Sequence, residues 1–339
     1  MKFVALCFSL IPSLSWATDA PWLGVVLGFG VIPLAEWFLG RTRGLAPALT
    51  HPAIVDLAWG TLLPRVVAVV LLLQVVFFSV HVLPNAAWLD VLWLGAAMGV
   101  VAGGVGIVFA HELGHRRSPL DRGLALALLS QVAFGHYQIE HNRGHHRMAA
   151  SLEDPASARQ DESLWAFMVR YFPGVWSGAR ELAAQANINP WLRPTGLLLT
   201  YAIWTSLILV TCGPKAWLGL GVQTLLALYL VAAVDYVEHW GLVRRRIDGR
   251  LERMAPRHIW DCDNWVSDAL LINLPRHAHH HLSPSDSADR LQHTADSPQM
   301  PTGYAGMVIL ASVWPLFRRL MTARLPREAD LHAVIPDQA

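Results

Sequence analysis

Charge and cysteine are both scarce in this sequence. Only 15% of the 339 residues are charged and 54% are hydrophobic, whereas soluble globular chains carry about 25% charged residues. This composition excludes a disordered chain, because disordered segments are polar and rich in charge. The three cysteines, Cys7, Cys212 and Cys262, are too few and too far apart for a disulfide-stapled secreted domain.

Net charge and redox cofactor motifs are lacking as well. A formal net charge of +1 argues against a nucleic-acid-binding protein, so we expect no nucleic acid among the partners. The sequence has no GxGxxG dinucleotide fingerprint. Three cysteines cannot supply the four thiolates of a rubredoxin or an iron–sulfur centre. Any redox chemistry in this chain therefore needs electrons from a separate protein.

Long apolar runs are abundant instead. A membrane-spanning helix needs about 20 mostly apolar residues, and the sequence offers six candidates. They are residues 3–18, 22–40, 66–83, 91–110, 196–212 and 216–234. We therefore predict an all-α polytopic membrane protein with about six transmembrane helices. A single domain is expected over residues 1–325, followed by a polar C-terminal tail at 326–339. Residues 1–17 also resemble a cleaved secretory signal, which is the alternative to a retained helix.

The basic residues predict how these spans are oriented. With six spans and cytoplasmic termini, every lysine and arginine except Lys215 falls on the cytoplasmic side. The long polar segments 111–195 and 235–339 then lie on that side too. We expect an integral protein of a bacterial-type inner membrane, in contact with membrane lipid, whose functional site faces the cytoplasm.

Sixteen histidines are the most informative feature of the chain, and most of them gather in four clusters. The clusters are His111-Glu112-Leu113-Gly114-His115, Glu140-His141-Asn142-Arg143-Gly144-His145-His146, Glu238-His239 and His277-Ala278-His279-His280-His281. Ionisable residues at the mouth of a membrane bundle need partners or a function, and imidazole binds iron, zinc, copper and nickel. One metal ion takes three to six ligands, so the clusters predict two metal ions or a larger site.

Two other interpretations fit the histidines less well. His111-Glu112-x-x-His115 by itself is the zinc-protease pattern, with two ligands and a general base on one helix. It would leave the histidines of the other clusters unexplained, and Asp248, the nearest match to a further ligand, lies in a polar stretch. A histidine-rich metal transporter would instead place histidines along a path through the membrane, whereas these gather at one face.

The motifs together resemble the integral-membrane alkane 1-monooxygenases of the AlkB type, which belong to the superfamily of membrane fatty acyl desaturases and hydroxylases. The resemblance is carried by HELGHRR at 111–117, IEHNRGHHR at 139–147, DYVEHWGL at 235–242, LPRHAHHHLSP at 274–284 and PTGY at 301–304. The third motif is the most discriminating, since general fatty acyl desaturases lack it. Three positions depart from the family pattern, with Asp235 for Asn, Trp240 for Tyr and His279 for Asp.

The resemblance implies a site and an activity. It implies a cytoplasmic histidine-rich cap with two non-haem irons. The implied ligands are His111, His115, His141, His145, His146, His239, His277, His280 and His281. It also implies hydroxylation of the terminal methyl of medium- or long-chain n-alkanes to primary alcohols with O2. Rubredoxin or a similar carrier, reduced by an NAD(P)H-dependent reductase, would supply the electrons. The alternative is a related hydroxylase or desaturase acting on alkyl-aromatic or fatty acyl substrates.

Three acids adjoin the implied ligands. Glu112, Glu140 and Glu238 are expected to accept hydrogen bonds from ligand imidazoles and so fix their orientation; direct coordination or proton transfer by one of them is the alternative. A further acid, Glu36, lies inside an expected span. We expect it to pair with Arg41 or to lie near the metal site.

Two other features suggest where partners bind. The basic run Arg244-Arg245-Arg246, with Arg250, Arg253 and Arg257, predicts either a dock for an acidic electron carrier or contact with lipid headgroups. Glycines in two of the expected spans predict either a channel for the substrate or close helix packing. They are Gly24, Gly28, Gly30, Gly99, Gly103, Gly104 and Gly106.

Overall fold

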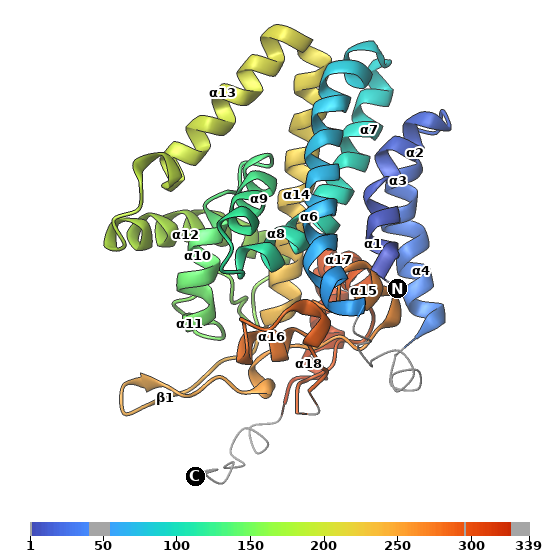
Figure 1. Cartoon of the computed structure of the whole chain (residues 1–339). Helices are drawn as coiled ribbons and strands as arrows, with labels where there is room; N and C mark the ends of the chain where they lie inside the picture. The colour runs from blue at the N-terminus through green and yellow to red at the C-terminus, as the bar shows by residue number, and fades with distance from the viewer. Residues whose placement is uncertain (1, 41–54, 295, 327–339) are drawn as a thin grey trace.

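The computed structural model describes residues 2–40, 55–294 and 296–326 (Figure 1). Arg41 and residues 327–339 of the predicted tail lie outside the described residues. The described part is mainly helical. Its only strands are β1 (Arg246–Ile247) and β2 (Arg250–Leu251), which pair antiparallel. The predicted all-α class is confirmed.

Four helical segments are long and apolar enough to cross a membrane. They are Leu62–Asn85, Trp88–Gly114, Pro194–Cys212 and Pro214–His239. The first segment contains most of α6 (Val55–Phe77), followed by η3 (Phe78–Val82) and η4 (Leu83–Asn85). The second segment contains α7 (Trp88–Val101), η5 (Ala102–Gly106) and α8 (Ile107–Gly114). The last two are α13 (Pro194–Cys212) and α14 (Pro214–His239). These four match the predicted spans that begin at residues 66, 91, 196 and 216.

The two N-terminal candidates form shorter helices. They are α1 (Lys2–Ser9), α2 (Ile11–Ala17), α3 (Leu23–Val26), η1 (Leu27–Val31) and α4 (Ile32–Leu39). Pro12 stands at the start of α2, where the missing N–H of proline costs no hydrogen bond. Pro33 follows the π-helical segment η1 by two positions. The run Leu23–Leu39 is apolar but shorter than the four long segments.

Glycines let the helices of the bundle approach closely. A Cβ at Gly95 would lie 2.6 Å from the carbonyl oxygen of Gly219, and one at Gly99 would lie 2.8 Å from Cβ of Leu226. Both glycines are on α7 and face α14, which runs beside it (Figure 1). Most of these glycines therefore serve helix packing, one of the two uses that their sequence pattern predicts. Gly30 and Gly104 differ, because nothing lies within 4 Å of their Cβ positions.

The remaining helices cover one end and one side of the bundle. They are α9 (Pro119–Ser130), α10 (Tyr137–Glu140), η6 (His141–His145), α11 (His146–Met148), α12 (Leu164–Gln185), η7 (Pro190–Leu192), η8 (Pro256–His258), α15 (Trp265–Leu270), α16 (His277–Leu282), η9 (Ala288–Arg290), α17 (Tyr304–Ser312) and α18 (Trp314–Thr322). Figure 1 shows α16 and α18 below the end of α14, next to the two-stranded hairpin. All four histidine clusters meet at this end.

Candidate metal centre

Nine histidines from four separate stretches of chain converge into two groups. The first group is His111, His115, His141, His146 and His280, and the second is His145, His239, His277 and His281. Within each group the candidate ligand atoms all lie within 4.8 Å of one another. The structure thus brings together all nine histidines expected to be ligands, and it divides them between two positions.

In the first group the close contacts join Nε2 atoms. His115 Nε2 lies 3.3 Å from His111 Nε2 and 3.2 Å from the Nε2 atoms of His141 and His146. Two nitrogens bound to one ion at about 2.1 Å and at right angles would lie about 3.0 Å apart. The spacing is therefore that of neighbouring ligands around one ion.

The second group has the same arrangement and is fully buried. His277 Nε2 lies 3.0 Å from His281 Nε2 and 3.4 Å from His239 Nε2. The buried Nε2 of His145 has no hydrogen-bond partner within the described part of the chain. A buried polar nitrogen without a partner is costly, and a metal ion at this position would satisfy it. The donor set therefore fits a metal ion.

A π-helix separates the histidines of one cluster. His141 and His146 are five residues apart, and their Nε2 atoms lie 3.0 Å from each other. His145, four residues from His141, belongs to the second group. Segment η6 is wound as a π-helix, in which the repeat is i to i+5 instead of i to i+4. An i, i+5 pair therefore forms here in place of the i, i+4 pair that an α-helix would give.

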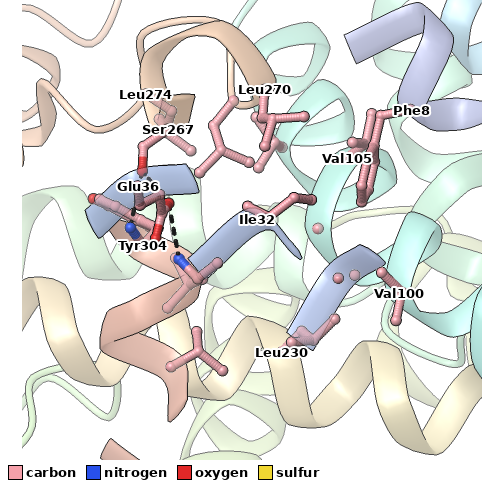
Figure 2. Close-up of a pocket in the computed structure, with 18 of the residues that line it drawn as sticks. Phe8, Ile32, Glu36, Val100, Val105, Leu230, Ser267, Leu270, Leu274 and Tyr304 are labelled. Atoms are coloured by element: carbon pink, nitrogen blue, oxygen red, sulfur yellow. Dashed lines mark hydrogen bonds between the residues drawn. The ribbon is translucent and has the colours of Figure 1, made fainter. Parts of the chain in front are cut away.

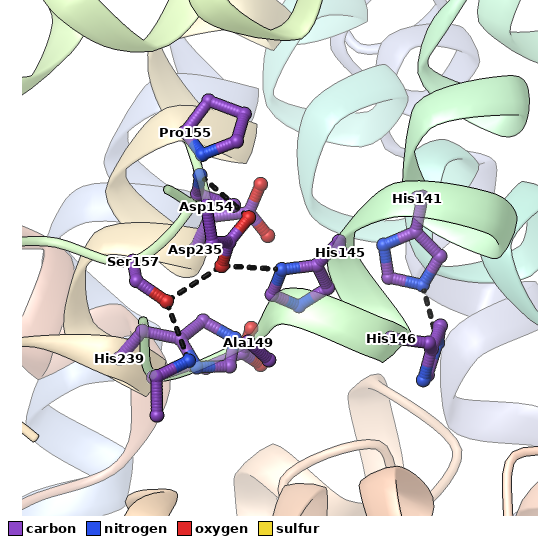
Figure 3. Close-up of polar contacts among 12 residues, drawn as sticks. His141, His145, His146, Ala149, Asp154, Pro155, Ser157, Asp235 and His239 are labelled. Atoms are coloured by element: carbon purple, nitrogen blue, oxygen red, sulfur yellow. Dashed lines mark hydrogen bonds and ion pairs between the residues drawn. The ribbon is translucent and has the colours of Figure 1, made fainter. Parts of the chain in front are cut away.

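Asp154 orients one of these histidines. Its Oδ2 lies 2.9 Å from His145 Nδ1 and accepts a hydrogen bond of 2.6 Å from Ser157 Oγ (Figure 3). Burial alone would lower the pKa of His145, but the Asp154 carboxylate outweighs it and raises that pKa to about 9. The imidazolium likewise holds the pKa of Asp154 below its ordinary value against the opposing effect of burial. The sequence analysis did not predict Asp154 as a site residue.

Several other histidines of the two groups favour the neutral form that binds metal. Burial, reinforced by neighbouring imidazoles, lowers the pKa of these side chains well below the usual value. They are His141, His146, His277, His280 and His281. Because metal ligands must be deprotonated at the bonding nitrogen, these side chains are ready to bind at neutral pH.

The three predicted glutamates have different partners from one another. Glu112 accepts hydrogen bonds from Arg116 at 2.7 Å and from the Ala288 N–H at 3.1 Å. Glu140 Oε2 is buried with no hydrogen-bond partner among the described residues. Glu238 Oε2 lies 3.3 Å from His277 Nε2. Among the described residues, Asp154 is the acid whose carboxylate contacts the Nδ1 atom of a candidate ligand, His145.

Two residues near the centre hold the chain in place. Arg244 is buried and donates to the carbonyl oxygens of Ala149 and Arg147 at 2.8 and 2.7 Å, at the end of the helix that carries His146. Gly241 has φ +72°, which lets the chain turn away directly after α14 ends at His239. Arg244 is therefore a structural residue and not part of an exposed dock.

Acidic side chains neutralise part of the positive charge in the rest of the basic run. Arg246 forms an ion pair with Glu153, and Arg257 pairs with Glu252 at 2.9 Å. Arg253 and Arg250 are exposed near or on the hairpin.

An apolar pocket lies beside the metal centre. The space in it that no atom fills is about 740 Å³, counting the part open to the surroundings. Its lining comes from α1, η1, α4, α7, η5, α8, α14, α15 and α17 (Figure 2). Three of its residues stand next to the centre. Val108 and Leu274 each precede a histidine of the centre by three positions, and Tyr304 donates a hydrogen bond to Glu238.

Glu36 lines this pocket, and both of its carboxylate oxygens accept hydrogen bonds from other residues of the protein. It accepts hydrogen bonds from Ser267 Oγ at 2.6 Å, the Ala305 N–H at 3.2 Å and the Gly306 N–H at 2.8 Å. A carboxylate at a helix N-terminus stabilises the helix dipole. Glu36 thus caps α17, and its expected pairing with Arg41 involves a residue outside the described ones.

Several known proteins are similar to most of this chain. A family profile described as fatty acid desaturase matches residues 86–311. The chain is 31% identical to alkane 1-monooxygenase 1 of Alcanivorax borkumensis, over 93% of this chain and 80% of the relative. It belongs to the alkane 1-monooxygenases of the fatty acid desaturase family.

Further alkane 1-monooxygenases match closely. Identity to alkane 1-monooxygenase 1 of Pseudomonas aeruginosa is 34%, covering 89% of this chain and 82% of the relative. The alkane 1-monooxygenase of Pseudomonas putida is 33% identical, and the alignment covers 73% of this chain and 63% of that protein. The hydroxylase component XylM of a xylene/toluene monooxygenase from Pseudomonas putida is more distant, at 23% identity.

Proposed function

We propose that this chain is a di-iron alkane 1-monooxygenase that hydroxylates the terminal methyl of medium- or long-chain n-alkanes. The observation that carries the proposal is a pair of histidine groups beside an apolar pocket, five imidazoles in one and four in the other. Identity of 31–34% to several alkane 1-monooxygenases supports the same activity. Identity to XylM is lower, which makes an alkyl-aromatic substrate the less favoured choice.

Iron is the metal that suits both the donors and the reaction. Imidazole binds iron, zinc and copper, but zinc has no redox chemistry. An unactivated methyl group offers no proton that a side chain could remove and no charge that it could stabilise. Two bound irons would supply the oxygen activation and electron transfer that breaking this C–H bond requires.

The chain's own residues hold and orient these ions. The nine histidines would be the ligands, and Asp154 would keep the His145 ring in the tautomer that has Nε2 free. Glu112 of the HExxH motif is engaged by Arg116 and Ala288, so it is not free to act as the general base of a zinc protease. This contact favours the oxygenase over that alternative.

The apolar pocket would hold the alkane. Leu, Val, Ile and Phe side chains line it, with Gly104 and Gly28 giving room. An n-alkane has no polar group, so its binding depends on apolar surface removed from water and on packing against the pocket walls. The residues that place the pocket next to the histidines, Val108 and Leu274, would set how close the chain end comes to the metal.

A separate protein would deliver two electrons per turnover. We propose rubredoxin, reduced by an NAD(P)H-dependent reductase, as this carrier. The exposed Arg250 and Arg253 offer positive charge to an acidic surface, whereas Arg244 does not, because it is buried. We further propose that the protein lies in a bacterial inner membrane with the histidine groups facing the cytoplasm, where such a carrier is available.

The test is metal content and turnover of the purified protein in detergent or lipid nanodiscs. We expect about two irons per chain and oxygen-dependent conversion of octane or hexadecane to the 1-alcohol when rubredoxin and its reductase are present. A single zinc ion with peptide cleavage would contradict the proposal. Hydroxylation of xylene or a fatty acyl chain, with no reaction of any alkane, would show that the proposed substrate is wrong. The proposed metal chemistry would still hold in that case.

A further inference from the structure

Helix α16 contributes histidines to both groups. His280 belongs to the first group, whereas His277 and His281 belong to the second. The helix has only six residues, and a helix this short is not stable without contacts to the rest of the protein. Any displacement of α16 would therefore disturb both groups at once, so the contacts that hold its position bear directly on the metal centre.

The start of α16 is capped from a distant part of the chain. The first N–H groups of a helix have no acceptor within the helix, and in the described part of the chain the N-cap residue Arg276 gives no side-chain cap. Asp261, which is fully buried and 17 positions from Ala278, supplies the acceptor instead. Its Oδ1 accepts the Ala278 N–H at 2.8 Å. A hydrogen bond to a carboxylate is stronger than one to a neutral acceptor.

The Asp261 carboxylate is itself held in place by a third segment. Its Oδ2 accepts hydrogen bonds from the N–H and the hydroxyl of Thr294, at 3.2 and 3.3 Å. The Asp261 N–H donates to the Pro298 carbonyl and its own carbonyl accepts from the Met300 N–H, both at 2.9 Å. Side chain and backbone are thus fixed together, which leaves Oδ1 directed at α16.

The neighbours of Asp261 tie the same segment to both histidine-bearing helices. The Trp260 N–H donates at 3.0 Å to the carbonyl of Glu238, near the end of α14, and the Cys262 N–H donates at 3.0 Å to the carbonyl of Pro275, just before α16. Asp261 therefore lies on a short bridge between the helix that carries His239 and the helix that carries three further histidines.

We propose that Asp261 is a positioning residue of the metal centre, which fixes α16 so that its histidines reach both groups. The inference rests on the proposed metal centre and deepens it. It distinguishes Asp261 from Asp154, which contacts one histidine of the second group. Loss of Asp261 should weaken both ions together, because one helix supplies ligands to both.

The experiment measures iron binding to the resting full-length protein, without turnover. Asp261→Ala removes the acceptor of the Ala278 N–H, and the iron affinity of both sites should fall by at least about tenfold. Asp261→Asn keeps one acceptor oxygen for that N–H and should restore most of the affinity. Asp261→Glu keeps the charge but displaces the oxygens by one methylene, so it should weaken both sites as well.

Ser297→Ala is the control for a general loss of stability. Ser297 is buried and its hydroxyl donates to the Ile259 carbonyl at 2.6 Å, in the same part of the fold. The substitution removes that bond and leaves the contact between Asp261 and Ala278 intact. It should lower the unfolding temperature of the metal-free protein as Asp261→Ala does, and still bind iron at both sites with normal affinity.

Normal iron affinity at both sites in Asp261→Ala would overturn the proposal. Should that variant not fold, normal affinity in Asp261→Glu would overturn it equally. An Asn variant that binds iron as weakly as the Ala variant, or an equal loss in Ser297→Ala, would also count against it, because neither result depends on the cap of α16. Absence of iron from the unmodified protein would instead refute the metal centre itself.

Discussion

The Nε2 atoms of His141 and His146 lie 3.0 Å apart, although the two residues are five positions apart in the sequence. The π-helical winding of η6 brings them to the same side and turns His145 toward the other group. In an α-helix, His141 and His145 would share a face. One local change of helix type thus lets a single cluster contribute to two sites.

This division predicts different effects of single histidine substitutions. His146→Ala should weaken the first site and His281→Ala the second, so each variant should retain about one tightly bound iron per chain. Turnover should fall by more than about 100-fold in both, because the reaction needs the pair. His81→Ala, an exposed histidine outside both groups, is the matched control and should keep about two irons by elemental analysis. Equal iron loss in all three variants would contradict the assignment.

Asp154 should contribute to metal affinity through His145. Asp154→Asn keeps the shape of the side chain but removes the charge that stabilises the Nδ1–H of His145. Outer carboxylates of this kind are typically worth about 10–100-fold in metal affinity or activity. Iron titration should therefore show that loss. Glu153→Gln, whose side chain is 49% exposed and pairs with Arg246, should bind iron normally, and an equal effect on both variants would argue against the role.

Substitution of Arg244 should lower the stability of the protein, whereas substitution of Arg253 should weaken binding of the electron carrier. Arg244→Met leaves the carbonyls of Arg147 and Ala149 without their donors, and we expect a stability loss of about 2–3 kcal/mol, as for hydrogen bonds to a charged group. Arg253→Ala should leave the unfolding temperature unchanged and raise the KM for the reduced carrier, most clearly at low salt. An unfolding temperature that falls only in the Arg253 variant would reverse this assignment.

Gly104 is the position where the pocket can be filled without a clash. A Cβ there meets nothing within 4 Å, whereas one at Gly28 would lie 2.7 Å from Val100 Cγ1 and would also strain the helix packing. Gly104→Leu should therefore shorten the longest alkane that the enzyme accepts. Gly221→Leu, also unobstructed but outside the pocket lining, should not. Product analysis over a series of n-alkanes of increasing length tests this prediction. An unchanged chain-length profile in Gly104→Leu would mean that the substrate binds outside this pocket.

His293 should make stability depend on pH in the alkaline range. Burial lowers its pKa, but the nearby carboxylates of Asp261 and Asp268, 3.9 and 3.5 Å from the ring nitrogens, outweigh this and raise the pKa to about 9; Asp263 lies 3.3 Å away. Since the folded-state pKa exceeds the unfolded value, the stabilisation is complete below about pH 6.5 and is lost as pH rises through about 9.

The expected loss in the free energy of unfolding is about 2–3 kcal/mol between about pH 6 and pH 10, because one pKa unit is worth about 1.4 kcal/mol. Thermal unfolding in detergent at both pH values measures it. His293→Ala should flatten the dependence while keeping both irons. If the variant and the parent protein lose the same stability, the effect comes from other groups.

The sequence by itself predicted the membrane class, six apolar runs of which four are long apolar helices in the structure, and the histidine clusters, because apolar length and imidazole clustering are local properties of the chain. Only the tertiary structure decided how the histidines divide between two groups, since that depends on the π-helical turn at 141–145 and on the packing of α16 against the end of α14. It also showed Asp154 as the partner of His145, Arg244 as a buried anchor and Glu36 as a helix cap. Each of these roles joins residues that are distant in sequence or separated by a loop, and no periodic pattern specifies such a contact before the chain has folded.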